Sequence, residues 1–243
     1  MNPAFLREAM ILGPDGLDRL QNCHVIVFGI GGVGSYCAEA LVRAGIGRLT
    51  FVDNDTVGET NLNRQLIALR STLGQYKSDV MARRALDINP QCQAVSIPEL
   101  YNAETKGRFF DHANYDYIVD AIDLVSCKLS LIETARQLGI PCISSMGTGN
   151  KLDPSRFVIT DIAKTTGCPL ARVMRKELRN HGIEHHTVLF SEEPPAKQLE
   201  QETPPPGRRS IPASVSWVPS VAGLMIAGHV VRDLLQIAPK STV

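Results

Sequence analysis

The sequence predicts a doubly wound α/β fold, in which a mainly parallel, Rossmann-like sheet carries helices on both faces. Three observations support this fold class. Several short runs are apolar almost throughout, segments with helical periodicity separate them, and a glycine-rich turn joins the first run to the first helix. Strands that are covered on both faces have such continuous apolar runs, and they alternate with helices in parallel sheets. Right-handed crossover connections are therefore expected.

The predicted elements alternate regularly over the first 150 residues. Strands are expected at 24–28, 49–53, 117–122 and 141–144, and helices at 33–44, 78–89 and 126–138. After about residue 150 the alternation loosens. Here the patterns predict strands at 157–161 and 187–190, a helix at 169–180 and a closing helix at 221–237. This second half is expected to be an elaboration of the nucleotide-binding core.

A chain of 243 residues is near the upper limit of what one domain usually holds, so we expect a single domain over 1–243. Its parts would be an N-terminal helical arm at 1–23, a nucleotide-binding core at 24–150, and a substrate and dimer elaboration at 151–243. Residues 191–210 are rich in Pro and Glu and predict a mobile surface loop. Such a loop is either a lid or partner platform, or simply disordered.

Composition narrows the classes of function. The 25 basic and 25 acidic residues cancel, so any RNA-binding surface must be a local patch. The six cysteines include no C-x-x-C pair, which argues against structural zinc and against a disulfide scaffold and favours a reducing cytoplasm. The N-terminal residues form no apolar signal core, and the apolar run at 217–227 is too short to span a bilayer. A cytoplasmic protein without a membrane segment is expected.

The stretch GIGGVGS follows the first apolar run directly. Gly29, Gly31 and Gly34 fit the pattern G-x-G-x-x-G, in which glycines let the backbone approach a phosphate at a helix N-terminus. Asp53 ends the next predicted strand, where a carboxylate accepts hydrogen bonds from ribose hydroxyls. Taken alone, this pattern favours an NAD-dependent oxidoreductase.

Other residues favour a triphosphate over NAD. The loop has an additional glycine, Gly32, and Asp53 opens a polar cluster that ends in NLNRQ. Arg64 and Lys77 place two cations near a phosphate-binding helix end. A triphosphate carries more negative charge than the pyrophosphate of NAD, and its cleavage requires that charge to be neutralised as it develops.

Asp123 follows the predicted strand that carries the sequence VDAID. Ligands bind at the carboxyl ends of strands in parallel sheets, and a carboxylate beside a triphosphate is suited to Mg²⁺. Taken alone, Asp123 is equally consistent with a turn or with the N-cap of the helix that follows. The presence of Asp53, Arg64 and Lys77 in the same chain favours the metal-binding interpretation.

These motifs resemble the ATP-dependent activating enzymes typified by the molybdopterin- and thiamine-biosynthesis adenylyltransferases and the ubiquitin-activating enzymes. GIGGVGS, the segment from Asp53 to Gln65, Lys77 and VDAID stand in the family's order, close to its spacing. The resemblance implies adenylation or phosphorylation of a carboxylate by ATP, with Mg²⁺.

The resemblance also implies a role for each matching residue. The nucleotide site would contain Gly29, Gly31, Gly32, Gly34, Asp53, Asp55, Asn61, Arg64, Gln65 and Lys77. Asp53 would bind the ribose, and Asp123 would hold Mg²⁺ or orient the reacting phosphate. The residues with a catalytic role would be Arg7, Arg64, Lys77 and Asp123. Arg7 matches an N-terminal arginine that reaches the ATP of the partner subunit in dimeric members; the alternative is a solvated arginine on a mobile terminus.

The second half of the chain resembles one subfamily, the tRNA threonylcarbamoyladenosine dehydratases. These enzymes activate the carboxylate of threonylcarbamoyladenosine next to the anticodon, after which a ring closes. The implied partners are this tRNA and a second copy of the chain, and a sulfur-transfer or cysteine desulfurase system is also compatible. The resemblance further implies a monovalent cation, Na⁺ or K⁺, around residues 151–161.

The chain departs from the family in one respect, and the interpretation of Cys168 and the alternative functions are open at this point. The family's zinc-binding C-x-x-C pairs are absent, and Cys168 is either a nucleophile or, as we favour, a small residue at a helix start. The alternative functions are activation of the terminal glycine of a sulfur-carrier or ubiquitin-like protein, and an NAD oxidoreductase or a non-catalytic nucleotide-binding protein.

The predicted helix at 169–180 is the candidate RNA-binding element. Its basic residues are Arg172, Arg175, Lys176 and Arg179, and Arg172, Arg175 and Arg179 share one face at helical spacing. Contacts from such a face to phosphates would give a salt-dependent affinity; the alternative is a solvated amphipathic helix. The small and apolar residues at 218–235 predict a core or dimer-interface helix, and we expect a homodimer.

Overall fold

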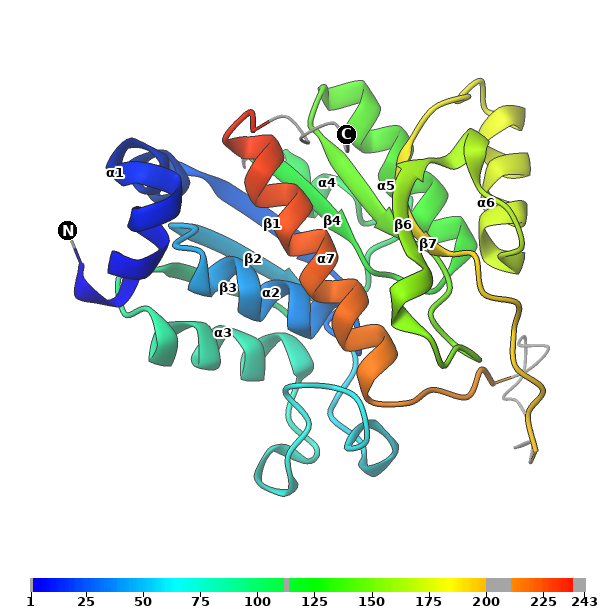
Figure 1. The fold of residues 1–243 in the computed structure, drawn as a ribbon, viewed down its shortest axis with the longest axis horizontal. Helices are drawn as coiled ribbons and strands as arrows, with labels where there is room; N and C mark the ends of the chain where they lie inside the picture. Colours follow the sequence, from blue (N-terminus) through cyan, green and yellow to red (C-terminus); the bar gives the residue numbers. More distant parts are fainter. Residues whose placement is uncertain (1, 112–113, 200–210, 238–243) are drawn as a thin grey trace.

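The computed structural model describes residues 2–111, 114–199 and 211–237 (Figure 1). Within them, seven strands form one sheet in the order β3-β2-β1-β4-β5-β7-β6. The strands are β1 (His24–Phe28), β2 (Arg48–Val52), β3 (Gln93–Ile97), β4 (Tyr117–Asp120), β5 (Cys142–Ser145), β6 (Phe157–Asp161) and β7 (Thr187–Ser191). Neighbouring strands are parallel except for β6 and β7, which are antiparallel. The sheet is therefore mainly parallel, as predicted.

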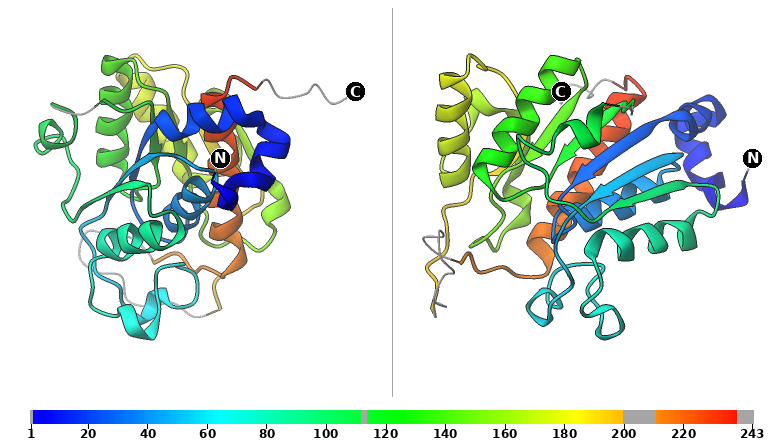
Figure 2. Two further views of the ribbon diagram at one scale, coloured as in Figure 1. Left: turned by 90° about the vertical axis from the view of Figure 1, so that its left-hand side faces the viewer. Right: turned by 180° about the vertical axis from the view of Figure 1, so that it is seen from behind.

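Helices cover both faces of this sheet (Figure 2). The α-helices are α1 (Leu6–Asn22), α2 (Gly34–Arg43), α3 (Lys77–Ile88), α4 (Gly107–Phe110), α5 (Val125–Leu138), α6 (Pro169–Asn180) and α7 (Trp217–Leu234). Short 3₁₀ helices lie at Pro3–Phe5, Glu59–Asn61, Arg70–Thr72, Pro154–Arg156 and Ile162–Lys164. Helices α1, α2, α3 and α7 pack on one face in a shared apolar cluster, and α4 and α5 pack on the other. Helix α6 lies beside α5. None of the described helices has the length and apolar character that crossing a membrane requires.

Most of the expected elements are present, with three corrections. The edge strand β3 and the short helix α4 were not expected. Strand β3 is only half-buried and lacks a continuous apolar run, and α4 has only four residues. Helix α7 begins at Trp217, four residues before the predicted start, since Pro219 lies in its first turn, where a missing N–H costs nothing. Ser191 is buried in β7, so it does not belong to the predicted loop; residues 192–199 form no helix or strand, and 200–210 lie outside the described residues.

The topology creates a site at one edge of the sheet. The strand order reverses between β1 and β4, so the loops that follow these strands diverge at their carboxyl ends. Figure 1 shows helix α1 at the opposite end of the strands from the long loops around residues 54–76. The fold thus concentrates the glycine turn, Asp53 and Asp123 at one edge.

A buried ion pair supports the end of β4. The ammonium of Lys128 on α5 donates a hydrogen bond to Asp120 Oδ2 at 2.9 Å, and both side chains are fully buried. The backbone N–H of Ile122 donates to Asp120 Oδ1 at 3.1 Å, so the same carboxylate also holds the loop that carries Asp123.

Close by, Ser144 Oγ is hydrogen-bonded to His186 Nε2 at 2.8 Å, and burial lowers the pKa of His186 to about 4.

Removing Lys128 should destabilise the fold. The substitution Lys128→Met keeps the length of the side chain but leaves the Asp120 carboxylate buried without its cation. We expect a loss of about 3–5 kcal/mol in the free energy of unfolding, measured by urea denaturation. The control is Arg108→Gln, which breaks an exposed pair with Glu99 and should cost about 0–1 kcal/mol. Equal costs for the two variants would contradict the structural role of the buried pair.

Candidate functional site

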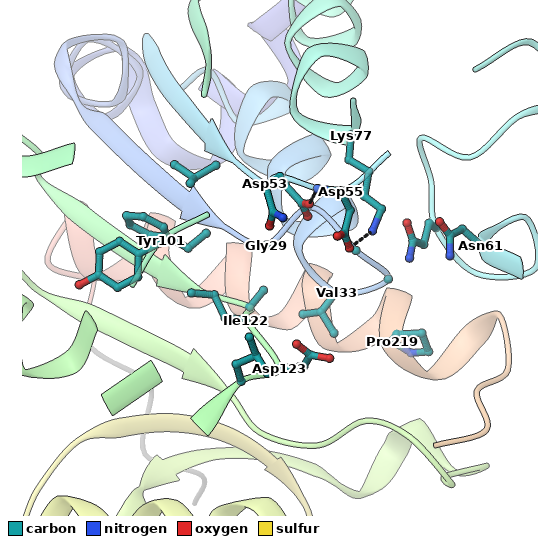
Figure 3. Close-up of a pocket in the computed structure, with 18 of the residues that line it drawn as sticks. Gly29, Val33, Asp53, Asp55, Asn61, Lys77, Tyr101, Ile122, Asp123 and Pro219 are labelled. Atoms are coloured by element: carbon teal, nitrogen blue, oxygen red, sulfur yellow. Dashed lines mark hydrogen bonds and ion pairs between the residues drawn. The ribbon is translucent and has the colours of Figure 1, made fainter. Parts of the chain in front are cut away.

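A cavity of about 620 Å³ lies at the carboxyl edge of the sheet (Figure 3). We call it the glycine-loop cavity; the loops after β1, β2, β3, β4 and β5 line it, together with the first turn of α7. Ten predicted site residues line this cavity: Gly29, Gly31, Gly32, Asp53, Asp55, Asn61, Arg64, Gln65, Lys77 and Asp123. Residues that are separated by more than 90 positions in the sequence therefore surround one space.

The glycines serve two different purposes. Gly29 has φ = 86°, and a Cβ there would lie 2.6 Å from the carbonyl oxygen of Ala121. A Cβ on Gly34 would lie 1.8 Å from the oxygen of Gly29. Gly34 does not line the cavity, and its contact with phosphate stays a prediction. By contrast, a Cβ on Gly31 would meet its nearest neighbour, the Gln65 amide, at 3.8 Å. The turn needs Gly29 and Gly34 for packing, whereas Gly31 leaves its backbone open to a ligand.

Asp53 braces the glycine loop. Its Oδ2 accepts a hydrogen bond of 2.6 Å from the backbone N–H of Ile30, and its Oδ1 accepts one of 2.9 Å from that of Asp55. Burial raises the pKa of the Asp53 carboxyl above its ordinary value, while the Lys77 cation and these two N–H groups oppose the rise. Each carboxylate oxygen keeps a further lone pair, so ribose hydroxyls can still donate to it.

Lys77 supplies a buried cation at the start of α3. Its side chain is 7% exposed, and its ammonium donates to Asp55 Oδ2 at 2.8 Å (Figure 3). The Asp55 side chain is 65% exposed, so the carboxylate can move into solvent while the ammonium stays at the cavity wall. A phosphate group entering the cavity would therefore compete with a solvated carboxylate for Lys77. This pairing means that Asp55 is better suited to hold Lys77 than to contact the nucleotide itself.

Arg64 and Gln65 lie beside the glycine loop. Arg64 Nη1 donates to the carbonyl of Thr60 at 2.8 Å and to the side chain of Asn63 at 2.9 Å, and burial lowers the pKa of this guanidinium. Gln65 is buried, and its Oε1 has no hydrogen-bond partner among the described residues. Rotating this amide by half a turn would present its NH₂ group at the same place. A buried amide without a partner next to an open Gly31 backbone fits a polar ligand such as a phosphate.

Asp123 lies across the cavity from Asp53 and Lys77 in the view of Figure 3. Helix α5 begins at Val125 with Leu124 as its N-cap and no side-chain cap hydrogen bond, so the alternative interpretation of Asp123 as the N-cap is wrong. Asp123 also lines a second cavity, described next. Because Asp123 lies between the two cavities, a ligand in the first cavity would meet a ligand in the second cavity beside this residue.

The second cavity has a volume of about 680 Å³ and adjoins the first. We call it the β5-loop cavity, because residues 146–151 after β5 form much of its wall. Eight residues line both cavities: Val33, Arg64, Ala121, Ile122, Asp123, Leu124, Thr148 and Ser214. Two ligand spaces thus share a border that carries one cation and one carboxylate.

The structure also places the two sets of basic residues that were predicted outside the nucleotide site. Arg7 is exposed on α1, away from the cavity of its own chain, so a contact with ATP would have to come from a partner subunit. Arg172, Lys176 and Arg179 are exposed on α6. Arg175 is half-buried, and its Nη1 donates to both oxygens of Thr165 at 2.6 Å. The exposed basic stripe is therefore completed by Lys176 in place of Arg175.

The structure also bears on the expectations for the Cys168 thiol and for a metal ion. Cys168 is the N-cap of α6, is 3% exposed and lines the β5-loop cavity. Within the described part of the chain, no group of three or more His, Cys, Asp or Glu side chains is placed to hold a metal ion. A cation at Asp123 would thus need further oxygen ligands, which the phosphates of a nucleotide supply.

Several lining residues were not predicted from the sequence. Glu99, Leu100 and Tyr101 follow the edge strand β3, and Pro219 comes from α7. Tyr101 is 3% exposed, and its hydroxyl is within 3.4 Å of Ser130 and 3.3 Å of Thr134 on α5. The sequence carries no motif for these residues; recognition of β3 would have indicated the first three, because its carboxyl end lies beside that of β2.

The arrangement is suited to a polyphosphate ligand and a second, acidic ligand. An open glycine backbone, Lys77 and Arg64 favour negative charge on one side of the cavity, and Asp53 lies where a hydroxylated sugar can bind. The residues present therefore fit a nucleoside triphosphate with a divalent cation. The open border toward the β5-loop cavity allows an acceptor group to reach the phosphates.

Comparison with known proteins agrees with this geometry. A sequence model of the ThiF family matches residues 5–243. The chain is 46% identical over 241 residues to the tRNA threonylcarbamoyladenosine dehydratase of Bacillus subtilis, with 96% of this chain and 94% of that protein covered. The crystal structure of E. coli tRNA N6-threonylcarbamoyladenosine dehydratase, TcdA, in complex with ATP superposes with a TM-score of 0.86 and 32% identity, covering 98% of this chain and 96% of that chain.

A more distant relative represents the alternative function. The sulfur carrier protein adenylyltransferase of Thermus thermophilus is 27% identical over 233 residues, which cover 93% of this chain and 74% of that protein. Since the family model covers nearly the whole sequence and the predicted motifs meet in one cavity, the chain belongs to the ThiF family, where it is similar to members named tRNA threonylcarbamoyladenosine dehydratase.

Proposed function

We propose that this protein is an ATP-dependent dehydratase that closes a ring on N6-threonylcarbamoyladenosine of tRNA, next to the anticodon. The observation that carries the proposal is the border between the two cavities, where Arg64 and Asp123 face both spaces. An enzyme that activates a carboxylate with ATP must bring that carboxylate to a phosphorus atom. The similarity to the Bacillus subtilis dehydratase over nearly the full length of both chains supports the choice of substrate.

The reaction converts a poor electrophile into a good one. A carboxylate oxygen attacks a phosphorus atom of ATP, and pyrophosphate or ADP leaves. An oxygen or nitrogen of the same ureido side chain then attacks the activated carbonyl carbon. The ureido group loses a proton, and AMP or phosphate leaves with the former carboxylate oxygen. Because the nucleophile is held in the same molecule, effective molarities can reach ~10⁵ M, and no covalent cysteine is needed.

The side chains of the glycine-loop cavity divide this work. Lys77 and Arg64 neutralise the negative charge on the phosphates, and the backbone around Gly31 and Gly32 approaches them closely. Asp53 holds the ribose while keeping the loop in place. Asp123 would hold Mg²⁺, which would supply charge neutralisation at the reacting phosphate. A monovalent cation around 151–161 belongs to the same proposal.

The proposed assembly is a homodimer in the cytoplasm that binds tRNA through α6. Arg172, Lys176 and Arg179 form an exposed basic stripe suited to phosphates. Large apolar side chains are exposed on α1, where Leu6, Met10 and Ile11 are 50%, 74% and 86% exposed. Exposed apolar side chains next to Arg7 support a subunit contact that carries this arginine to the partner's ATP. A sulfur-transfer or cysteine desulfurase partner remains compatible with the family.

The nucleosides of treated tRNA provide the test of this function. Incubation of the protein with ATP and tRNA that contains threonylcarbamoyladenosine should produce a nucleoside lighter by one water, measured by mass spectrometry after digestion. Omission of ATP is the control. ATP cleavage that depends on an added carrier protein ending in glycine, with unchanged tRNA, would favour the carrier-activating alternative. Binding of NADH without ATP would exclude both activities.

Loss of the Asp123 carboxylate should stop turnover without unfolding the protein. We expect Asp123→Ala to lower kcat at least about 10²-fold, because the reacting phosphate loses its metal or its orientation. The control Asp87→Asn removes an exposed carboxylate on α3 and should keep the wild-type kcat. Thermal unfolding checks that both variants are folded. Wild-type turnover in a folded Asp123→Ala variant would show that the metal is held elsewhere.

A further inference from the structure

The β5-loop cavity contains a buried cation that the phosphate site does not use. Lys151 is 3% exposed and lines this cavity but not the glycine-loop cavity. Its ammonium donates to the main-chain carbonyl of Glu193, the one hydrogen-bond acceptor it has among the described residues. An ammonium has three N–H donors, and the described residues supply an acceptor for one of them. Burial lowers the pKa of Lys151 and the neighbouring Glu193 carboxylate only partly offsets this effect, so an acceptor in the cavity would stabilise the charged ammonium.

The backbone around Lys151 is held in place from both sides. Asn150 adopts φ = 57°, its N–H donates to Ala213 at 2.7 Å, and its carbonyl accepts from Ala196 at 2.7 Å. The Glu193 carboxylate accepts from the N–H groups of Leu152 at 2.9 Å and Asp153 at 3.1 Å. These contacts fix the segment between residues 192–199 and 211–216, so Lys151 is presented at a defined position in the cavity wall.

The remaining wall suits a flat, largely apolar group. Met146, Leu170, Ile211 and Pro212 line this cavity but not the glycine-loop cavity. A volume of about 680 Å³ is within the usual range for a site that holds a small organic ligand. The cavity therefore offers an apolar slot with a cationic donor in its wall and Arg64 and Asp123 at its opening to the phosphates.

We propose that the β5-loop cavity binds the modified adenosine itself, with Lys151 donating to an oxygen or nitrogen acceptor of its ureido-purine part. This inference rests on the proposed function and names the subsite of its substrate. The carboxylate of the nucleoside lies at the shared border, because only there can it reach a phosphorus atom. Lys151 holds the other end, so it is a binding residue that sets affinity and orientation.

The first test removes the charge of Lys151. Lys151→Met should raise KM for the modified tRNA about tenfold or more and leave the Kd for ATP unchanged, since a hydrogen bond to a charged group is lost. The isolated nucleoside threonylcarbamoyladenosine should likewise bind more weakly to this variant in calorimetry. The control Lys106→Met removes an exposed charge outside both cavities and should match the wild type.

The second test changes the volume of the cavity without changing charge. Gly147 lines only the β5-loop cavity, and a Cβ there would lie 3.8 Å from Cys168 Sγ and Leu170 Cβ, which is ordinary contact. Gly147→Ala should therefore bind the nucleoside like the wild type. Gly147→Leu should fill the slot, abolish nucleoside binding and keep ATP binding. If Lys151→Met folds poorly, the Gly147→Ala and Gly147→Leu variants still test whether the nucleoside binds in this cavity.

The outcomes separate the two proposals. Wild-type protein that leaves tRNA unchanged in the presence of ATP would overturn the proposed function. Wild-type protein that dehydrates tRNA, together with Lys151→Met and Gly147→Leu variants that retain the wild-type KM for tRNA, would overturn only the assignment of this cavity. Loss of ATP binding in Gly147→Leu would also contradict the assignment, because the two cavities would then not be separate sites.

Discussion

The double hydrogen bond that Asp53 accepts is the interaction on which the site depends. One oxygen takes the N–H of Ile30 at the start of the glycine loop, and the other takes the N–H of Asp55 after β2. The carboxylate thereby joins two neighbouring strand ends across the cavity floor. Ser35 extends the link, because its hydroxyl donates to the carbonyl of Gly31 and accepts from the N–H of Leu66. A nucleotide therefore meets a loop that is already ordered.

Two charge networks lie on opposite sides of the cavity, one with an exposed carboxylate and one that is fully buried. On one side, Asp53 accepts a hydrogen bond from the N–H of Asp55, and the Asp55 carboxylate in turn pairs with Lys77. On the other side Asp120 pairs with Lys128 and also holds the N–H of Ile122, next to Asp123. Because both networks start at strand ends, Lys77 and Asp123 lie on opposite sides of the cavity. This arrangement suits the border between the cavities to the proposed alignment of a carboxylate with a phosphate.

The sequence predicted the parts of the fold and the site that depend on local pattern. The apolar run of β1, the glycine turn and Asp53 are neighbours in a recognisable order, and all of them lie where expected. Gly34 was assigned to the phosphates; the structure shows that it also packs closely against Gly29, a use of glycine that the sequence does not distinguish from ligand contact. Tyr101, Pro219 and Lys151 were not assigned to a cavity, since only the tertiary arrangement of β3, α7 and the segment after β5 brings them there. Periodicity predicts which face of an element is buried, but not which distant element covers it.

The central claim is that the oxygen lost from the substrate leaves on a phosphorus atom of the nucleotide. It can be tested with tRNA whose threonylcarbamoyl carboxylate is labelled with ¹⁸O, followed by mass spectrometry of the nucleotide and phosphate products of one turnover. The account predicts ¹⁸O in AMP or in inorganic phosphate, and which of the two carries the label distinguishes adenylation from phosphorylation. Label found in water, with unlabelled AMP and phosphate, would contradict activation of the carboxylate in this site.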